Sequence, residues 1–243
     1  MLDFARFQAL TFDCYGTLIN WEAGILGVLR PLLAAHGKQV SDAEILALYA
    51  ELEPEAQTGE YLRYREVLHR VVHGFGLRLR FPVSPSEADS LPESLGDWKP
   101  FPDTVPALRQ LQQRYKLAII SNIDDDLFAL TARHLEVKFD HVITAQQCRT
   151  YKPSLNNFCT ALARMDLPQD RVLHVAESLF HDVAPAHSLG LATVWVNRRK
   201  NRDGVAATRL VDVRPDLEVP DLKSLADLVE CSAPSPAPSQ PLA

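Results

Sequence analysis

The chain has 243 residues, of which 47% are hydrophobic and 23% are charged, and its formal net charge is −6 at pH 7. This composition is typical of a packed globular protein and excludes a disordered chain, which combines low hydrophobicity with high net charge. The negative charge argues against a protein that binds nucleic-acid backbones. No apolar run approaches the ~18–20 residues that cross a bilayer, and the N-terminus lacks a secretory signal, so we expect a cytoplasmic protein.

Short, continuous apolar runs predict the strands of a buried sheet. They cover residues 9–12, 117–120, 172–176 and 192–196, with a weaker run at 141–144. Runs of this length are typical of parallel strands that helices cover on both faces. Apolar residues at helical spacing lie between the runs. The alternation of strand and helix predicts an α/β fold with an open, doubly wound parallel sheet.

One stretch interrupts this alternation directly after the first strand. Residues 22–95 carry only helical patterns, which predict three amphipathic helices, a loop over 79–90 and a fourth short helix. The last residues are rich in proline and serine, which favours a disordered tail. We therefore predict an α/β core from residues 1–20 and 97–230, a helical cap at 21–96 and a tail at 231–243.

Polar residues follow the first two predicted strands. Asp13 ends the first strand and is followed by Gly16 and Thr17, whose turn and amides can hold an anion. Ser121 and Asn122 end the second strand. Ligands bind outside the carboxyl ends of strands in open α/β sheets, which favours a functional interpretation. Taken alone, each residue is equally well explained as a turn former or a helix cap.

Further charged residues occupy equivalent places later in the chain. Lys152 precedes a proline and a helical pattern, and a lysine in such a place is usually solvent-exposed. Glu177 and Ser178 follow the strand at 172–176, and Asp182 comes five residues after Glu177. The acidic triplet from Asp124 is expected to be a solvated helix start. The full set places Asp, Ser-Asn, Lys and two acids at successive strand ends.

In this order and spacing, the motifs resemble those of the haloacid dehalogenase superfamily over residues 8–200. The matching features are Asp-x-Tyr-Gly-Thr-Leu at Asp13, the Ser-Asn strand end, Tyr-Lys-Pro around Lys152 and the final acidic pair. The resemblance implies that Asp13 is a nucleophile that forms a covalent intermediate. Phosphatase members carry a second aspartate where this chain has Tyr15, and a phenol with a pKa of ~10 is a poor acid near neutral pH. The motif therefore resembles that of the 2-haloacid dehalogenase branch.

This resemblance implies hydrolytic dehalogenation of a short 2-haloacid to the 2-hydroxy acid, through an aspartyl ester and without a cofactor. Lys152 is expected beside Asp13, where its charge would keep the carboxylate ionised. Asp182 is expected to orient Lys152 or to activate water. The residues expected to bind substrate are Tyr15, Thr17, Ser121 and Asn122. The resemblance also allows a homodimer.

Several residues depart from the pattern of that branch. Glu177 and Ser178 replace part of its Ser-Ser-Asn segment, and we include both as additional site residues. Phe158 replaces a tyrosine six residues after the lysine. Ala50 stands where the second cap helix carries an arginine for the leaving halide. The basic residues that could replace this arginine are Arg63, Arg65 and His69.

Two other functions stay open. A phosphatase would hold Mg²⁺ with the oxygen atoms of Asp13, Glu177 and Asp182. A non-catalytic protein would keep only the fold. The dehalogenase interpretation expects Glu177 to pair with a cation, in the first place Lys152, and to bind no required metal.

Overall fold

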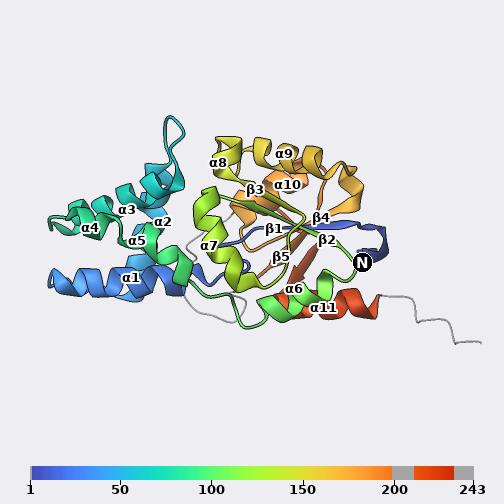
Figure 1. Cartoon of the computed structure of the whole chain (residues 1–243), viewed down its shortest axis with the longest axis horizontal. Helices are drawn as coiled ribbons and strands as arrows, with labels where there is room; N and C mark the ends of the chain where they lie inside the picture. Colours follow the sequence, from blue (N-terminus) through green and yellow to red (C-terminus); the bar gives the residue numbers. More distant parts are fainter. Residues whose placement is uncertain (1, 199–210, 233–243) are drawn as a thin grey trace, which may run out of the picture.

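The computed structural model describes residues 2–198 and 211–232. These residues contain one six-stranded sheet in the order β3-β2-β1-β4-β5-β6, and all neighbouring strands are parallel (Figure 1). The predicted α/β fold with a parallel sheet is therefore confirmed. The strands are β1 (Ala9–Phe12), β2 (Lys116–Ser121), β3 (His141–Thr144), β4 (Val172–Ala176), β5 (Ala192–Val196) and β6 (Leu217–Val219).

The sequence pattern located five of these strands and missed β6. Four predicted strands have the observed bounds, and β2 is one residue longer at each end than its apolar run. The missed strand is three residues long and contains Glu218, which is exposed. Of its three residues only Val219 is buried, so β6 has no continuous apolar run.

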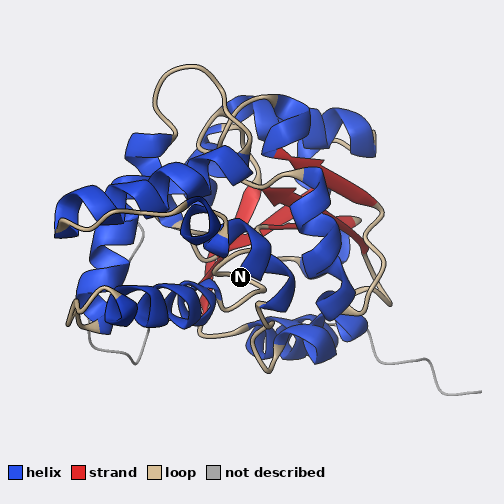
Figure 2. Ribbon diagram, turned by 60° about the vertical axis from the view of Figure 1, so that its left-hand side comes forward, coloured by secondary structure: helices blue, strands red, loops and turns tan. Residues whose placement is uncertain are grey.

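Helices cover both faces of the sheet (Figure 2). Along β2, Ala118 and Ile120 pack with α9 residues such as Phe158, whereas Leu117 and Ile119 join the larger cluster that includes α6 and α11. Successive side chains point to opposite faces of a strand, so a continuous apolar run packs against the helices on both faces of the sheet. The core helices are α6 (Thr104–Leu111), α7 (Asp125–Leu135), α8 (Ala145–Cys148), α9 (Leu155–Met165), α10 (Ala184–Ser188) and α11 (Leu222–Cys231), with a π-helix, η4, at Leu179–Val183.

Five further helices, which we call the cap helices, lie together at one end of the sheet (Figure 1). They are α1 (Trp21–Ala35), α2 (Asp42–Ala56), α3 (Tyr64–Leu79), α4 (Pro85–Ala88) and α5 (Ser90–Ser94). Their buried apolar faces form one cluster with residues of the sheet. The predicted loop over 79–90 is wrong at α4, where Ser84 and Glu87 form a capping box that starts a one-turn helix.

The order of the strands places a switch point beside β1. The chain runs from β1 to β2 and β3 on one side, then crosses to β4, β5 and β6 on the other. Loops that leave β1 and β4 therefore diverge at their carboxyl ends, where open α/β sheets bind ligands.

Helix α11 is the last helix of the described residues. Helix α11 includes Cys231, so it extends one residue into the predicted tail, and residues 233–243 of that tail lie outside the described residues. Within the described ranges, no helix is both long enough and apolar enough to span a membrane.

Candidate active site

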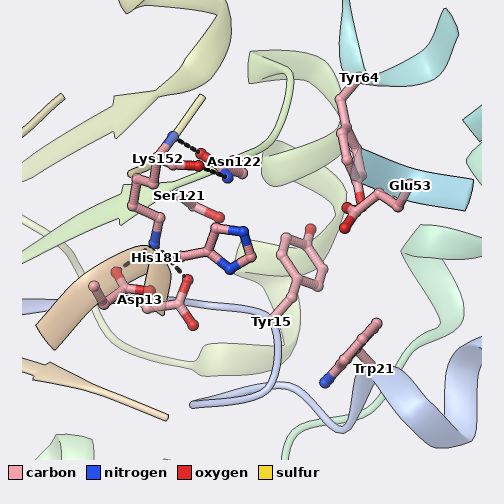
Figure 3. Close-up of a pocket in the computed structure, with 10 residues that line it drawn as sticks. Asp13, Tyr15, Trp21, Glu53, Tyr64, Ser121, Asn122, Lys152 and His181 are labelled. Atoms are coloured by element: carbon pink, nitrogen blue, oxygen red, sulfur yellow. Dashed lines mark hydrogen bonds and ion pairs between the residues drawn. The ribbon is translucent and has the colours of Figure 1, made fainter. Parts of the chain in front are cut away.

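A cavity of about 80 Å³ lies at the carboxyl ends of β1, β2 and β4, next to the cap helices (Figure 3). It is much smaller than the ~300–1,000 Å³ of sites for drug-sized ligands, so it suits a ligand of few atoms. Six of the predicted site residues line it, namely Asp13, Tyr15, Ser121, Asn122, Lys152 and Asp182. The other four lining residues, Trp21, Glu53, Tyr64 and His181, were not predicted.

A buried ammonium group joins the two aspartates at the base of the cavity. Lys152 Nζ donates to Asp13 Oδ1 at 2.8 Å, to Asp182 Oδ1 at 2.6 Å and to the carbonyl oxygen of Ile120 at 2.8 Å. Lysine has three N–H donors, so these acceptors use its whole capacity. All three charged side chains are buried. Lys152 is thus an internal cation rather than the exposed lysine that its position alone would suggest.

Burial and charge act against each other in this cluster. Burial raises the pKa of Asp13, and the charge of Asp182 adds to this, so the pKa stays above its usual value despite Lys152. Lys152 acts to lower the pKa of Asp13, as expected, but its charge does not outweigh burial. Burial also acts to raise the pKa of Asp182, but Lys152 and a hydrogen bond from His174 outweigh it and lower that pKa. For Lys152, the carboxylates outweigh burial and raise its pKa.

The turn after β1 holds the second oxygen of Asp13. Thr17 Oγ1 donates to Asp13 Oδ2 at 2.8 Å and accepts from the backbone N–H of Glu177 at 2.8 Å. Thr17 therefore lies behind the cavity surface and links the ends of β1 and β4. Gly16 makes this turn with a φ of +99°, and a β-carbon there would lie 3.0 Å from Trp21 Nε1. A side chain at Gly16 would thus strain the turn and press on the cavity wall.

His174 on β4 extends the cluster into the core, and no sequence motif pointed to it. Its Nε2 lies 3.1 Å from Asp182 Oδ1, and its Nδ1 lies 2.9 Å from Thr11 Oγ1. With the proton on Nε2, the ring donates to Asp182 and accepts from Thr11. Phe158 packs edge-on against the imidazole, with ring centroids 5.2 Å apart. The apolar run that revealed β4 gave no signal of this role.

We expect His174→Leu to lower the free energy of unfolding by about 1.5–3 kcal/mol, the range for a hydrogen bond to a charged group. Without this donor, the pKa of Asp182 rises, because burial is then opposed by Lys152 alone. Urea denaturation at several pH values measures the change. Thr11→Val is the matched control, since it removes only the hydroxyl that contacts His174 Nδ1 and keeps the imidazole that contacts Asp182. Equal stability of His174→Leu and the wild-type protein would contradict this role.

Ser121 and Asn122 have different surroundings although they are adjacent. Asn122 accepts from the Lys152 N–H at 2.6 Å and donates to the Lys152 carbonyl at 3.1 Å, so it fixes the loop that carries the ammonium. Ser121 Oγ is buried, lines the cavity and has no hydrogen-bond partner among the described residues. A buried hydroxyl without a hydrogen-bond partner destabilises the folded protein. A polar ligand atom that forms a hydrogen bond with Ser121 Oγ would remove this penalty.

Tyr15 is a neutral wall of the cavity. Its hydroxyl lies 2.7 Å from Thr131 Oγ1, and its ring packs edge-on against Trp98. Burial raises its pKa well above the usual value, so the phenol keeps its proton. Tyr15 thus supplies no carboxylic acid at the position two residues after Asp13.

Glu177 and Ser178 are not among the residues that line the cavity. The three donors of Lys152 are used by other acceptors, so the structure does not form the expected ion pair between Lys152 and Glu177. Ser178 Oγ accepts from the His181 N–H at 3.0 Å and lies 3.2 Å from His181 Nδ1. It therefore positions the imidazole that lines the cavity. Burial lowers the pKa of His181 to about 4, so the ring is neutral at pH 7.

The cap and the core are joined by a buried carboxylate. Asp124 accepts from the backbone N–H groups of Tyr64 and Arg65, both at 3.0 Å, at the start of α3. The expectation of a solvated triplet is thus wrong for Asp124, which is fully buried. Its carboxylate satisfies N–H groups that the first turn of a helix leaves without partners. This contact fixes Tyr64 at the cavity.

The three basic residues considered as halide ligands point elsewhere. Arg63 and Arg65 pair with Asp126, and His69 Nε2 lies 2.7 Å from Asp89. None of the three lines the cavity. The cap instead contributes Glu53, three residues after Ala50 on α2. Residues at this spacing share a helix face, so an acid occupies the side where a base was expected.

The carboxylates do not form the metal site of the alternative hypothesis. Lys152 Nζ lies between Asp13 and Asp182, and Glu177 is not part of their cluster. Over residues 2–198 and 211–232, no three side chains of His, Cys, Asp or Glu are placed to hold a metal ion. As arranged, the residues do not fit Mg²⁺, which needs an octahedral shell of oxygen atoms.

The chain is similar to known hydrolases. A family model for hydrolases, described as haloacid dehalogenase-like hydrolase, matches residues 7–190. Haloacetate dehalogenase H-2 of Moraxella sp. (strain B) is 26% identical over 230 residues, which cover 92% of this chain and 98% of that protein. Glyceraldehyde 3-phosphate phosphatase of Methanopyrus kandleri is 29% identical over 137 residues, which cover 54% of this chain and 57% of that protein.

A similar solved structure is L-2-haloacid dehalogenase from Xanthobacter autotrophicus with chloropropionic acid covalently bound. It superimposes with a TM-score of 0.76 at 21% identity, over 93% of this chain and 100% of that one. This likeness shows the fold. The family model covers well over half of the chain, and the predicted nucleophile and lysine meet at the expected strand ends. The chain therefore belongs to the family of haloacid dehalogenase-like hydrolases.

Proposed function

We propose that this protein hydrolyses the carbon–halogen bond of a short 2-haloacid and releases the 2-hydroxy acid. The observation that carries this proposal is the ion cluster of Asp13, Lys152 and Asp182. Lys152 Nζ lies 2.8 Å from Asp13 Oδ1 and 2.6 Å from Asp182 Oδ1, so it supplies a positive charge to the two carboxylates without a metal ion. The small cavity and the named activity of the relative from Moraxella support the same substrate class.

In the first step, an oxygen of Asp13 attacks the carbon that bears the halogen. The new C–O bond forms as the carbon–halogen bond breaks, and the halide leaves with the bonding electrons. Lys152 and Thr17 each donate to one oxygen of Asp13 and fix its orientation. A halide needs no proton to leave, so the neutral Tyr15 is compatible with this step.

In the second step, water adds to the carbonyl carbon of the Asp13 ester. The ester C–O bond then breaks, one proton of the water passes to the oxygen of the released hydroxy acid, and the other is released to solvent as Asp13 returns to the carboxylate. Asp182 holds Lys152 against Asp13, and its lowered pKa suits this positioning role better than proton abstraction. Ser121 Oγ is proposed to bind the substrate carboxylate, alongside Asn122 and Tyr15.

A panel of substrates tests this proposal against the phosphatase alternative. We expect chloride release from chloroacetate or 2-chloropropionate at the same rate with magnesium and with excess chelator, because Lys152 supplies the positive charge of the site. An aryl phosphate should not be hydrolysed. Halide electrodes and a phosphate assay measure the two products. Phosphate release that stops in chelator and returns with magnesium would favour the phosphatase.

We propose that the enzyme uses no metal cofactor and acts in the cytoplasm. Residues 21–96 would act as a cap over a core of residues 1–20 and 97–230. A homodimer is also compatible with the family assignment, and analytical ultracentrifugation tests it.

A further inference from the structure

The side of the cavity formed by the cap carries an unusual acid. Figure 3 places Glu53 and Tyr64 across the pocket from Asp13. Tyr64 donates to Glu53 Oε1 at 2.8 Å, and the Tyr49 hydroxyl lies 3.2 Å from that of Tyr64. Among the described residues, Oε1 is the only oxygen of Glu53 with a hydrogen-bond partner. The other oxygen is available to a ligand in the cavity.

The direction of the displacement brings the leaving group to this side. A nucleophile attacks a saturated carbon in line, so the halide departs on the face opposite Asp13. Lys152 is the only cation among the described residues that line the cavity, and its three donors are all in use. His181 is neutral because its pKa is lowered to about 4 by burial. The departing anion therefore needs an uncharged donor on the cap side.

We propose that Glu53, in its protonated form, donates a hydrogen bond to the halide as it leaves. This inference rests on the proposed dehalogenase function and assigns the residue that takes the place of a cap arginine. The Asp13–carbon bond forms, the carbon–halogen bond breaks, and the halide takes the electron pair. The proton stays on Glu53, so no further reactant is required. As a carboxylate, the same residue would repel both the halide and the substrate.

The surroundings of Glu53 favour its neutral form. Burial raises its pKa, and the hydrogen bond from Tyr64 opposes this only in part. The core contributes Asp13, Lys152 and Asp182, whose charges sum to −1 when all are ionised. An anionic substrate raises the pKa of Glu53 further. The phenols around it keep their protons because their pKa values are raised, and they are Tyr15, Tyr49, Tyr64 and Tyr151.

The test compares Glu53→Gln and Glu53→Ala with the wild-type enzyme, using chloride release from chloroacetate between about pH 6 and pH 9. The wild-type kcat should fall at high pH, where Glu53 ionises. Glu53→Gln keeps a donor that does not titrate, so it should lose this fall and stay within about threefold of wild type at low pH. Glu55→Gln is the control, because Glu55 lies on the same helix but pairs with Arg78 at the surface.

The leaving group provides a second readout that a purely structural role would not change. Fluoride accepts stronger hydrogen bonds than bromide, so Glu53→Ala should slow fluoroacetate at least about tenfold more than bromoacetate. An equal loss for both halides would overturn the proposal, as would a high-pH fall that persists in Glu53→Gln. Activity that rises with pH and is lost in Glu53→Gln would instead indicate a carboxylate that binds a cationic substrate.

These results separate the inference from the proposed function. Circular dichroism reveals whether Glu53→Ala folds. If it does not, the pH profile of the isosteric Glu53→Gln still decides whether Glu53 acts on the leaving halide. Halide release by the wild-type enzyme with an unchanged profile in Glu53→Gln overturns only the role of Glu53. No halide release by the wild-type enzyme from any substrate overturns the dehalogenase function and the inference with it.

Discussion

Replacing Asp13 by asparagine is expected to lower the rate of halide release by more than about a hundredfold, because an amide cannot replace the ionised nucleophile. Asparagine has nearly the same size and retains an oxygen that can accept from Lys152 or Thr17. The fold should therefore persist, which circular dichroism and thermal unfolding can verify. A folded variant that retains more than about a hundredth of the activity would contradict the assignment of Asp13.

Isotope labelling distinguishes a nucleophile from a general base at Asp13. In the two-step reaction, water adds to the aspartyl carbonyl, so a single turnover in H₂¹⁸O places the label in the peptide that contains Asp13. If Asp13 only activated water, the label would appear in the hydroxy acid instead. Mass spectrometry of the digested protein and of the product reads both outcomes.

Replacing Lys152 by methionine is expected to abolish activity and to lower stability by about 3–5 kcal/mol at neutral pH, because it leaves two buried carboxylates without their cation. The loss should shrink as the pH falls, since Asp13 and Asp182 then become protonated and neutral. Any residual activity should appear only at higher pH, because the pKa of Asp13, already raised by burial, rises further. Urea denaturation and pH–rate profiles measure the two effects.

Asp182→Asn provides the matched comparison for this prediction. In the double variant with Lys152→Met, one buried carboxylate is absent, so part of the lost stability should return. Strict additivity of the two single variants would show that the charges do not interact. An unchanged acid limb of the Lys152→Met profile would show that Lys152 does not act on Asp13.

The sequence alone determined five of the six described strands and six of the residues that line the candidate site. A buried parallel strand must be apolar on both faces. Its residues therefore form a continuous apolar run in the sequence, as at β1 and β4. The ends of such strands meet at one edge of the sheet. For this reason Asp13, Lys152 and Asp182 could be grouped before their distances were known, and their contacts match that grouping.

Only the tertiary structure decided which neighbours complete the site. The pKa of Asp13 depends on the opposing effects of burial and of the charges of Lys152 and Asp182. The amino-acid composition does not reveal which effect is larger. His174 lies within a strand, and Glu53 lies on a cap helix whose orientation depends on packing against the core. Helical periodicity gives the faces of α2 but not which turn reaches the cavity. The resemblance to the dehalogenase branch pointed to Ala50, and no sequence pattern pointed to Glu53. Residues that meet only when separate elements pack, such as Asp124 with the start of α3, leave no local pattern in the chain.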